Sequence, residues 1–100
     1  MGNDVYLKVF ADSKCRLVAI CDIDLIGETF REGKLKLDVK PGFYKGSASN
    51  ISEALHEIAA ADIANLVGSG IVDAAVREGL VDPTAIVRIA GVPHVQIVKL

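Results

Sequence analysis

The residues that could do acid-base chemistry gather near the end of the chain, in the segment Gly91-Val92-Pro93-His94-Val95-Gln96. Histidine is the side chain whose ordinary pKa lets it exchange a proton near neutral pH. Because proline fixes one backbone angle, we expect a tight turn that presents His94 between two apolar runs. We predict that this turn brings His94 close to Asn65 or to residues 22–27, which would form a site for a small molecule.

A cysteine and several polar residues could complete that site. Cys21 would supply the thiol of a Cys-His nucleophilic centre. The further polar candidates for the same pocket are Asp22, Asp24 and Gln96. The structural alternative is an inert core cysteine and a turn histidine that bonds to backbone. Chain order leaves both interpretations open, so it does not decide whether this protein is an enzyme.

Metal and phosphate motifs are weak. The two acids of Asp22-x-Asp24 supply fewer oxygens than hard-cation loops usually need, and the cysteines and histidines lack zinc-site spacing. Gly68-Ser69-Gly70 precedes a predicted helix whose N-terminus could bind phosphate, but the Lys-Ser/Thr of a P-loop is missing. That helix carries Arg77 as its one cation, which is a poor face for a DNA groove. We therefore expect no metal, no cofactor and no DNA.

The strongest positive signal is a strand of alternating lysines beside aromatic residues. Between residues 30 and 46, five cations oppose two acids, so this segment carries +3 and the rest of the chain −5. RNA-binding modules combine cations that contact phosphates with rings on which unpaired bases stack. The alternative is a solvated edge strand whose aromatic neighbours belong to the core. The predicted RNA-binding residues are Lys34, Lys36, Lys40, Lys45 and Tyr44.

Period-two alternation predicts three strands in the first half of the chain. Residues Asp4 to Phe10 alternate, and Cys15 to Asp22 is almost continuously apolar, so we place this second strand at the centre of the sheet. The third strand runs from Lys34 to Lys40, with Leu35, Leu37 and Val39 expected inward and the three lysines and Asp38 outward. Phe43 to Gly46 is expected to extend it.

Helical spacing begins at Asn50, which can cap a helix in which Glu53 completes a capping-box-like start. A continuous helix would place Asp62 and Asn65 on its apolar face. Either the helix breaks near Asp62, or the two side chains form a buried hydrogen-bonded pair. The spacing does not choose between these alternatives.

The remaining pattern completes an α+β fold. We expect Asn50 to Gly79 to be mostly helical, and Ile86 to Ala90 and Val95 to Leu100 to form two final strands. The predicted architecture is one domain over residues 1–100, with three N-terminal strands, central helices and two C-terminal strands in an antiparallel or mixed sheet.

Composition and cysteine spacing indicate the class of protein and its cellular location. Hydrophobic residues make up 51% and charged residues 24%, which is typical of a folded domain whose apolar excess could also serve an oligomer interface. Cys15 and Cys21 lie in one predicted strand, too far apart for a disulfide, so we expect reduced thiols and a cytoplasmic protein. No secretory signal or transmembrane helix is predicted. One Gln, three Asn and one Met favour a thermostable protein.

Four segments carry a resemblance to a known family. The chain resembles the small archaeal proteins of domain of unknown function 424. The segments occur in the family's order and are Cys21-Asp22-x-Asp24-Leu25-Ile26-Gly27, Phe43-Tyr44-Lys45-Gly46, Ala64-Asn65-Leu66-Val67-Gly68 and Gly91-Val92-Pro93-His94-x-Gln96. The resemblance implies an archaeal cytoplasmic protein whose genes lie near those of translation, and it supplies no catalytic residues.

Two functions of different classes follow. The first is an RNA-binding or ribonucleoprotein-binding module of the translation apparatus that uses the basic strand, with RNA or a ribosome-associated protein as its partner. The second is an enzyme or small-molecule-binding protein with its site around His94, Asn65 and Asp22. A homo-oligomer is compatible with either, and no membrane partner is expected.

Overall fold

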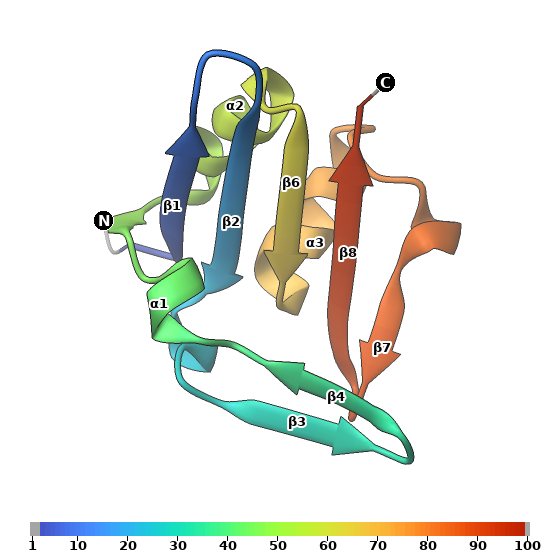
Figure 1. Ribbon diagram of the computed structural model, residues 1–100. Helices are drawn as coiled ribbons and strands as arrows, with labels where there is room; N and C mark the ends of the chain where they lie inside the picture. The colour runs from blue at the N-terminus through green and yellow to red at the C-terminus, as the bar shows by residue number, and fades with distance from the viewer. Residues whose placement is uncertain (1–2, 100) are drawn as a thin grey trace.

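A mixed sheet of six strands forms the centre of the fold, and a separate two-stranded hairpin crosses one of its faces. The computed structural model describes residues 3–99 (Figure 1). The strands are β1 Val5–Ala11, β2 Arg16–Asp22, β3 Thr29–Glu32, β4 Leu35–Asp38, β5 Ser47–Ser49, β6 Ile63–Val67, β7 Val87–Ile89 and β8 Val92–Val98. The helices are α1 Pro41–Tyr44, α2 Ile51–Ala60 and α3 Ser69–Arg77, and single 3-10 turns lie at Ile23–Leu25 and Pro83–Ala85.

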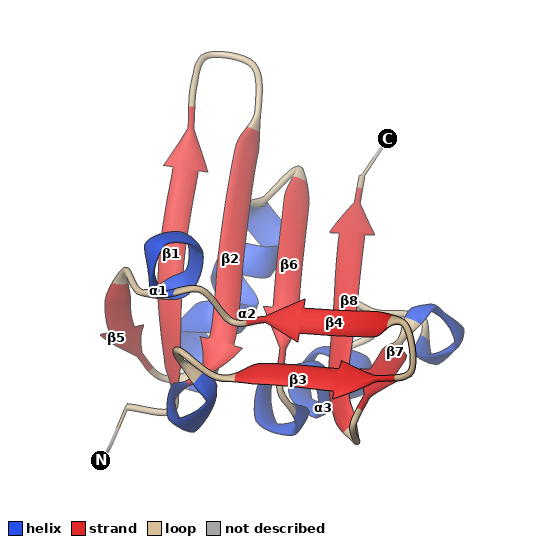
Figure 2. Ribbon diagram, turned by 60° about the horizontal axis from the view of Figure 1, so that its bottom comes forward, coloured by secondary structure: helices blue, strands red, loops and turns tan. Residues whose placement is uncertain are grey.

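The sheet has the order β5-β1-β2-β6-β8-β7, and its one parallel pair is β2 with β6. Helices α2 and α3 cover one face, which we call the helix side (Figure 1). The β3–β4 hairpin and α1 lie on the other face, which we call the hairpin side (Figure 2). The predicted α+β class, with a mixed sheet around central helices, is therefore confirmed.

The central position of β2 follows from its composition. Alternate residues of a strand point to opposite faces, and β2 is covered on both. Val18 and Ile20 pack against the helices, whereas Ala19 and Cys21 lie beneath the hairpin. All four side chains are fully buried, which is why this stretch is apolar at every position.

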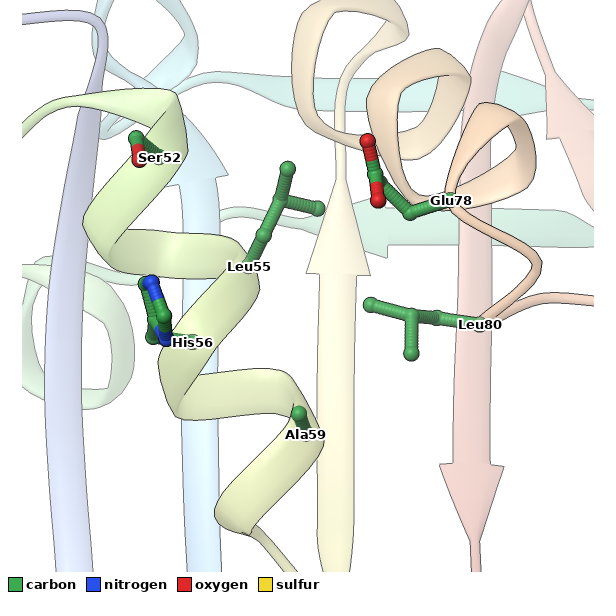
Figure 3. A pocket seen from close by; sticks show the side chains of 6 residues that line it. All are labelled: Ser52, Leu55, His56, Ala59, Glu78 and Leu80. Atoms are coloured by element: carbon green, nitrogen blue, oxygen red, sulfur yellow. The ribbon is translucent and has the colours of Figure 1, made fainter.

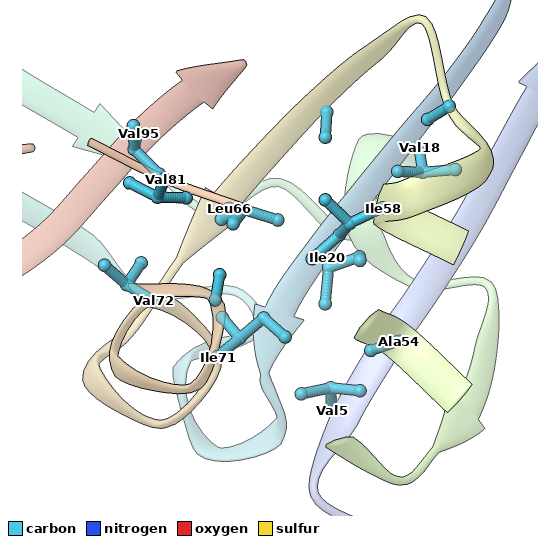
Figure 4. Packing of buried hydrophobic residues seen from close by; sticks show 13 residues of the cluster. Val5, Val18, Ile20, Ala54, Ile58, Leu66, Ile71, Val72, Val81 and Val95 are labelled. Atoms are coloured by element: carbon cyan, nitrogen blue, oxygen red, sulfur yellow. The ribbon is translucent and has the colours of Figure 1, made fainter. Parts of the chain in front are cut away.

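Two layers of core result from this arrangement. On the helix side, residues of the central strands contact Ile58 of α2 and Ile71 and Val72 of α3 (Figure 4). On the hairpin side, a smaller core contains Cys21, Tyr44 and five aliphatic residues, which are Ala19, Leu37, Val39, Val67 and Ile89. Within residues 3–99, no helix has the length and apolar character needed to cross a membrane.

The helix predicted from residue 50 is shorter than expected. Asn50 caps α2 by accepting a bond from the Glu53 N–H at 2.8 Å, but α2 ends at Ala60 and residues 63–67 form strand β6. Asp62 aligns this strand with β2, because it exchanges two bonds of 2.8 Å with the Arg16 backbone through its own N–H and its carboxylate. A short apolar run cannot be assigned to helix or strand by spacing alone, and here sheet pairing decides.

The choice left open by the sequence is thereby resolved. The helix breaks before Asp62, and the alternative of a buried pair between Asp62 and Asn65 is wrong because Asp62 is exposed. Residues 50–79 were expected to be mostly helical. They form two helices, α2 and α3, with the central strand β6 between them.

The third predicted strand belongs to a hairpin outside the main sheet. β4 pairs with β3, a strand that was not expected from the sequence, and Gly33 makes the turn between them with a φ of +60°. Leu37 and Val39 are buried in the hairpin-side core as expected, whereas Leu35, on the same face of β4, is 49% exposed because it lies beside the turn at the tip of the hairpin. Residues 41–44 form the short helix α1 in place of a strand extension, since Pro41 suits a first helical position.

The turn expected around His94 lies earlier in the chain. Ala90 and Gly91 have φ values of 52° and 81°, which is the geometry of a two-residue hairpin turn between β7 and β8. Pro93 and His94 are therefore strand residues of β8. Proline is tolerated here because it lies at the start of the strand, just past the last β6–β8 residue pair.

Candidate functional site

The basic residues predicted to bind RNA lie on the hairpin side and are exposed. Lys34 is in the β3–β4 turn, Lys36 is in β4, and Lys40 and Lys45 flank α1. Tyr44 differs from them because it is 5% exposed and packs in the hairpin-side core. Burial raises the pKa of the Tyr44 hydroxyl to about 12. Its ring is therefore not available to a base, and the expectation that it lies on the binding surface is corrected.

One of these cations, Lys36, lies directly opposite a further cation, Arg31. Arg31 and Lys36 are direct partners in the β3–β4 register. Because Phe30 and Leu37 pack inward against the sheet, alternation places Arg31 and Lys36 on the outer face of the hairpin. Like charges directly opposite in a strand pair are destabilising. The outer face of the hairpin is therefore a positively charged surface that folding alone does not favour.

Two acids near this surface, Asp38 and Glu32, are already engaged. Asp38 Oδ1 accepts the Thr29 hydroxyl at 2.7 Å, and Asp38 Oδ2 lies 3.4 Å from Lys36 Nζ. The Thr29 bond first, and then Lys36, hold the pKa of Asp38 below its ordinary value. Glu32 Oε1 accepts the Ala90 N–H at 2.7 Å and so fastens the hairpin to the β7–β8 turn.

An aromatic pair lies beside Lys8 and was not anticipated. Phe10 of β1 is 38% exposed and stacks on Phe43 of α1, with ring centroids 5.4 Å apart and an interplanar angle of 19°. Lys8 Nζ lies 5.2 Å from the Phe10 centroid and donates to the Gly42 carbonyl at 2.8 Å. The signal in the sequence was the alternation of Tyr6, Lys8 and Phe10, which puts all three on one face of β1.

The polar residues of the alternative pocket are only partly brought together. Asn65 pairs with Gln96 and Val67 pairs with His94 in the β6–β8 register, so Asn65 and His94 are diagonal neighbours, about 7 Å apart. Both are half-buried and lie on the hairpin side by strand alternation. Burial lowers the pKa of His94, so its imidazole is neutral at pH 7. Proximity to Asn65 thus comes from strand pairing and not from a turn.

The thiol of Cys21 is not a partner for this histidine. Cys21 pairs with Val67, which in turn pairs with His94, so two strand spacings, about 10 Å, separate Cys21 from His94. The side chain is fully buried, and this burial raises the pKa of the thiol to about 12. A thiolate nucleophile is therefore not supported at this position.

Asp22 points to the helix side of the sheet, away from His94, and its carboxylate caps helix α3. Its two carboxylate oxygens accept the N–H groups of Gly70 at 2.8 Å and Ile71 at 3.0 Å, at the start of α3. Gly68 has a φ of +112°, and a Cβ at this position would overlap the Asp22 carboxylate. The glycines of Gly68-Ser69-Gly70 therefore make room for this cap, and the N–H groups considered for phosphate already have an acceptor.

Asp22 and Asp24 consequently do not converge with His94. The Asp22 side chain points to the helix side, so the sheet lies between it and the pair formed by Asn65 and His94. Asp24 is exposed in the 3-10 turn after β2. Across the described part of the chain, no three His, Cys, Asp or Glu side chains are placed to hold a metal ion.

Surface hollows occur on both sides of the molecule. One of about 300 Å³ lies on the helix side between α2 and the segment after α3, where Leu55 and Leu80 face each other and His56 is separated from Glu78 (Figure 3). A second of about 300 Å³ lies beside Phe10 at the end of the β1–β2 hairpin. Neither is lined by His94 or Asn65.

Comparison with known proteins identifies the family. A family model described as "Protein of unknown function (DUF424)" matches residues 11–100, a range that includes all four segments noted above. No curated protein matches the chain. The crystal structure of "an uncharacterized conserved protein from Methanopyrus kandleri" is similar, with a TM-score of 0.77 and 26% identity over 93% of this chain and 89% of that chain. The chain belongs to the DUF424 family.

Proposed function

We propose that this protein binds RNA through its hairpin side, with the exposed cations of the β3–β4 hairpin contacting phosphates. The observation that carries the proposal is the opposed pair Arg31 and Lys36, continued by Lys34 in the turn and Lys40 after β4. A polyanion would neutralise this unfavourable pairing of like charges, and counterion release would drive the association.

The distribution of charge over the fold supports the same side. The segment from residue 50 to 82, which contains α2 and α3, has six acidic residues and one arginine, a net charge of −5. On the hairpin side, Lys8 and Lys45 lie against the aromatic rings of Phe10 and Tyr6. An anionic strand would therefore be attracted to the hairpin side and repelled from the helix side. The same contrast disfavours DNA reading by α3.

The rival pocket has less support. His94 and Asn65 lie together as neighbours on the hairpin side, but Asp22 lies on the other side of the central sheet. We therefore propose no catalytic site built from these three residues.

A charge-reversal experiment tests the proposal. The probe is a fluorescein-labelled single-stranded RNA, and its anisotropy reports affinity at several salt concentrations. Each phosphate contact contributes about −0.7 to the slope of log affinity against log salt, so three contacts give about −2. Replacing Lys34, Lys36 and Lys40 together by Glu should abolish binding, because all three side chains are exposed.

The control reverses charges on the helix side. Arg77 and Arg88 line a separate hollow beside α3 and are exposed, so Arg77→Glu with Arg88→Glu should leave RNA binding nearly unchanged. Circular dichroism confirms that each variant is folded. Salt-insensitive binding by the wild type, or equal binding by the lysine triple variant, contradicts the proposal.

The resemblance to DUF424 proteins favours a place in the translation apparatus for this binding. Its test is co-sedimentation of the native protein with ribosomal particles, with and without ribonuclease. We expect the protein to leave the ribosomal fractions after ribonuclease treatment. Retention in these fractions after complete RNA digestion would point to a ribosome-associated protein as the partner.

A further inference from the structure

The ring of Phe10 is held in place and yet partly exposed. On one side it stacks on Phe43, which makes a perpendicular contact with the buried ring of Tyr44 at 4.9 Å. This chain of rings fixes the orientation of Phe10 at the end of β1. Burial of an aromatic side chain stabilises a fold, and yet Phe10 is left 38% exposed.

A hollow of about 300 Å³ adjoins this ring on the hairpin side. Its apolar lining comes from Phe10 and its register partner Leu17, with Ala11 and Cys15. The volume is at the small end of the range in which proteins hold small ligands. A flat, apolar ring system could therefore lie against Phe10 and above Leu17.

Polar groups at the border of the hollow suit a nucleotide. Asp12 Oδ1 accepts the N–H groups of Lys14 at 2.8 Å and Cys15 at 2.9 Å, and these bonds lower the pKa of its carboxyl. The ionised carboxylate keeps lone pairs that can accept an N–H group of a base, such as the ring N3–H of uracil. On the same strand face, Lys8 Nζ lies 5.2 Å from the Phe10 centroid, so a cation for the phosphate lies beside the ring.

We infer that Phe10 and the hollow beside it form a stacking site for an unpaired nucleobase, so that the RNA bound by this protein is single-stranded. This inference rests on the proposed RNA-binding function. Bases in a duplex stack on one another and offer no free ring face, whereas bases of a single strand can be splayed out onto aromatic side chains. The cations of the hairpin then hold the backbone while Phe10 receives a base.

A tryptophan at position 10 tests the inference, because the chain has no tryptophan of its own. In Phe10→Trp, a short oligouridylate should quench the indole fluorescence as a base stacks on it. The matched control is Val9→Trp, since Val9 is also 38% exposed but points to the other face of β1. Its fluorescence should change little when the same RNA binds.

An affinity measurement supports the fluorescence result. Phe10→Ala should weaken binding of the oligouridylate at least about fivefold, the usual effect of losing one base-aromatic stack. The salt slope should stay that of the wild type because the lysines remain. Wild-type protein should bind the single strand more tightly than a duplex RNA of the same length.

The outcomes separate this inference from the function on which it rests. Salt-sensitive RNA binding with equal fluorescence changes in both tryptophan variants, or with full affinity in Phe10→Ala, overturns the stacking site and leaves the RNA-binding function standing. Equal affinity for duplex and single-stranded RNA would also overturn the stacking site and leave the RNA-binding function standing. Absence of binding to either RNA refutes the proposed function, and the stacking site with it.

Discussion

The two sides of the central sheet are covered in different ways. On the helix side, α2 and α3 bury the strand residues, and a carboxylate of the sheet, Asp22, caps α3. On the hairpin side, the β3–β4 hairpin covers only one end of the strands (Figure 2). Phe10, near the other end of β1, stays partly exposed. The helix side is built for stability, whereas the hairpin side keeps cations and a ring accessible.

The largest expected effect tests the cap on the helix side. Gly68→Ala should destabilise the fold by about 4 kcal/mol, because a side chain at a φ of +112° is strained and displaces the Asp22 carboxylate from α3. Urea unfolding measures the change. Gly42 is a matched control, since its Cβ would meet nothing within 4 Å, so Gly42→Ala should be nearly neutral. An equal loss of unfolding free energy in Gly68→Ala and Gly42→Ala would contradict the role of Asp22 as the cap of α3.

The next effect compares truncation of a buried side chain on the helix side with truncation of a half-exposed one on the β3–β4 hairpin. Ile58 of α2 is fully buried, so Ile58→Ala should cost about 3 kcal/mol of unfolding free energy. Leu35 of the hairpin is 49% exposed, so Leu35→Ala should cost less than about 1 kcal/mol. Thermal and urea unfolding give both values. A larger loss for Leu35→Ala would show that the hairpin contributes more to stability than its exposure indicates.

The smallest effect is a difference in pH dependence between two aspartates. Burial raises the pKa of Asp22 above its ordinary 3.8, so its contribution to stability declines as pH rises from below 3.8 through the raised pKa. The pKa of Asp38 is lowered, so its contribution is present above 3.8 and is lost as pH falls through the lowered value.

Asparagine variants separate these two slopes. In urea unfolding across the acidic range, Asp22→Asn should remove the decline just above 3.8, whereas Asp38→Asn should remove part of the loss on further acidification. Slopes of the same sign for both residues would contradict the opposite environments described for them.

The sequence predicted what depends on local pattern. Continuous apolar character placed β2 at the centre, and Asn50 marked the start of α2. It failed where pairing between distant segments decides, as for β6, whose five residues join two neighbouring strands, and for β3, whose Arg31 and Glu32 are exposed. A short run of residues does not contain the information on which partner it will meet.

For the candidate site too, the sequence predicted the residues that follow a local pattern and missed those that depend on packing between distant segments. The lysines could be found because exposed residues of a strand follow its period. The exposed aromatic residue could not, because the choice between Tyr44 and Phe10 depends on how α1 packs against β1, which brings residues 10 and 43 into contact. Likewise, the sequence could not show that Asp22 and His94 point to opposite sides of one sheet.

The most direct test of the difference between the two sides is an amide NMR titration of the protein with a single-stranded RNA. We expect shift changes at residues 31–40 and around Phe10, with little change along α2 and α3. The changes should weaken together as salt is added, because backbone phosphates provide the common attraction. Shift changes concentrated on α2 and α3, or none on the hairpin side, would contradict the account.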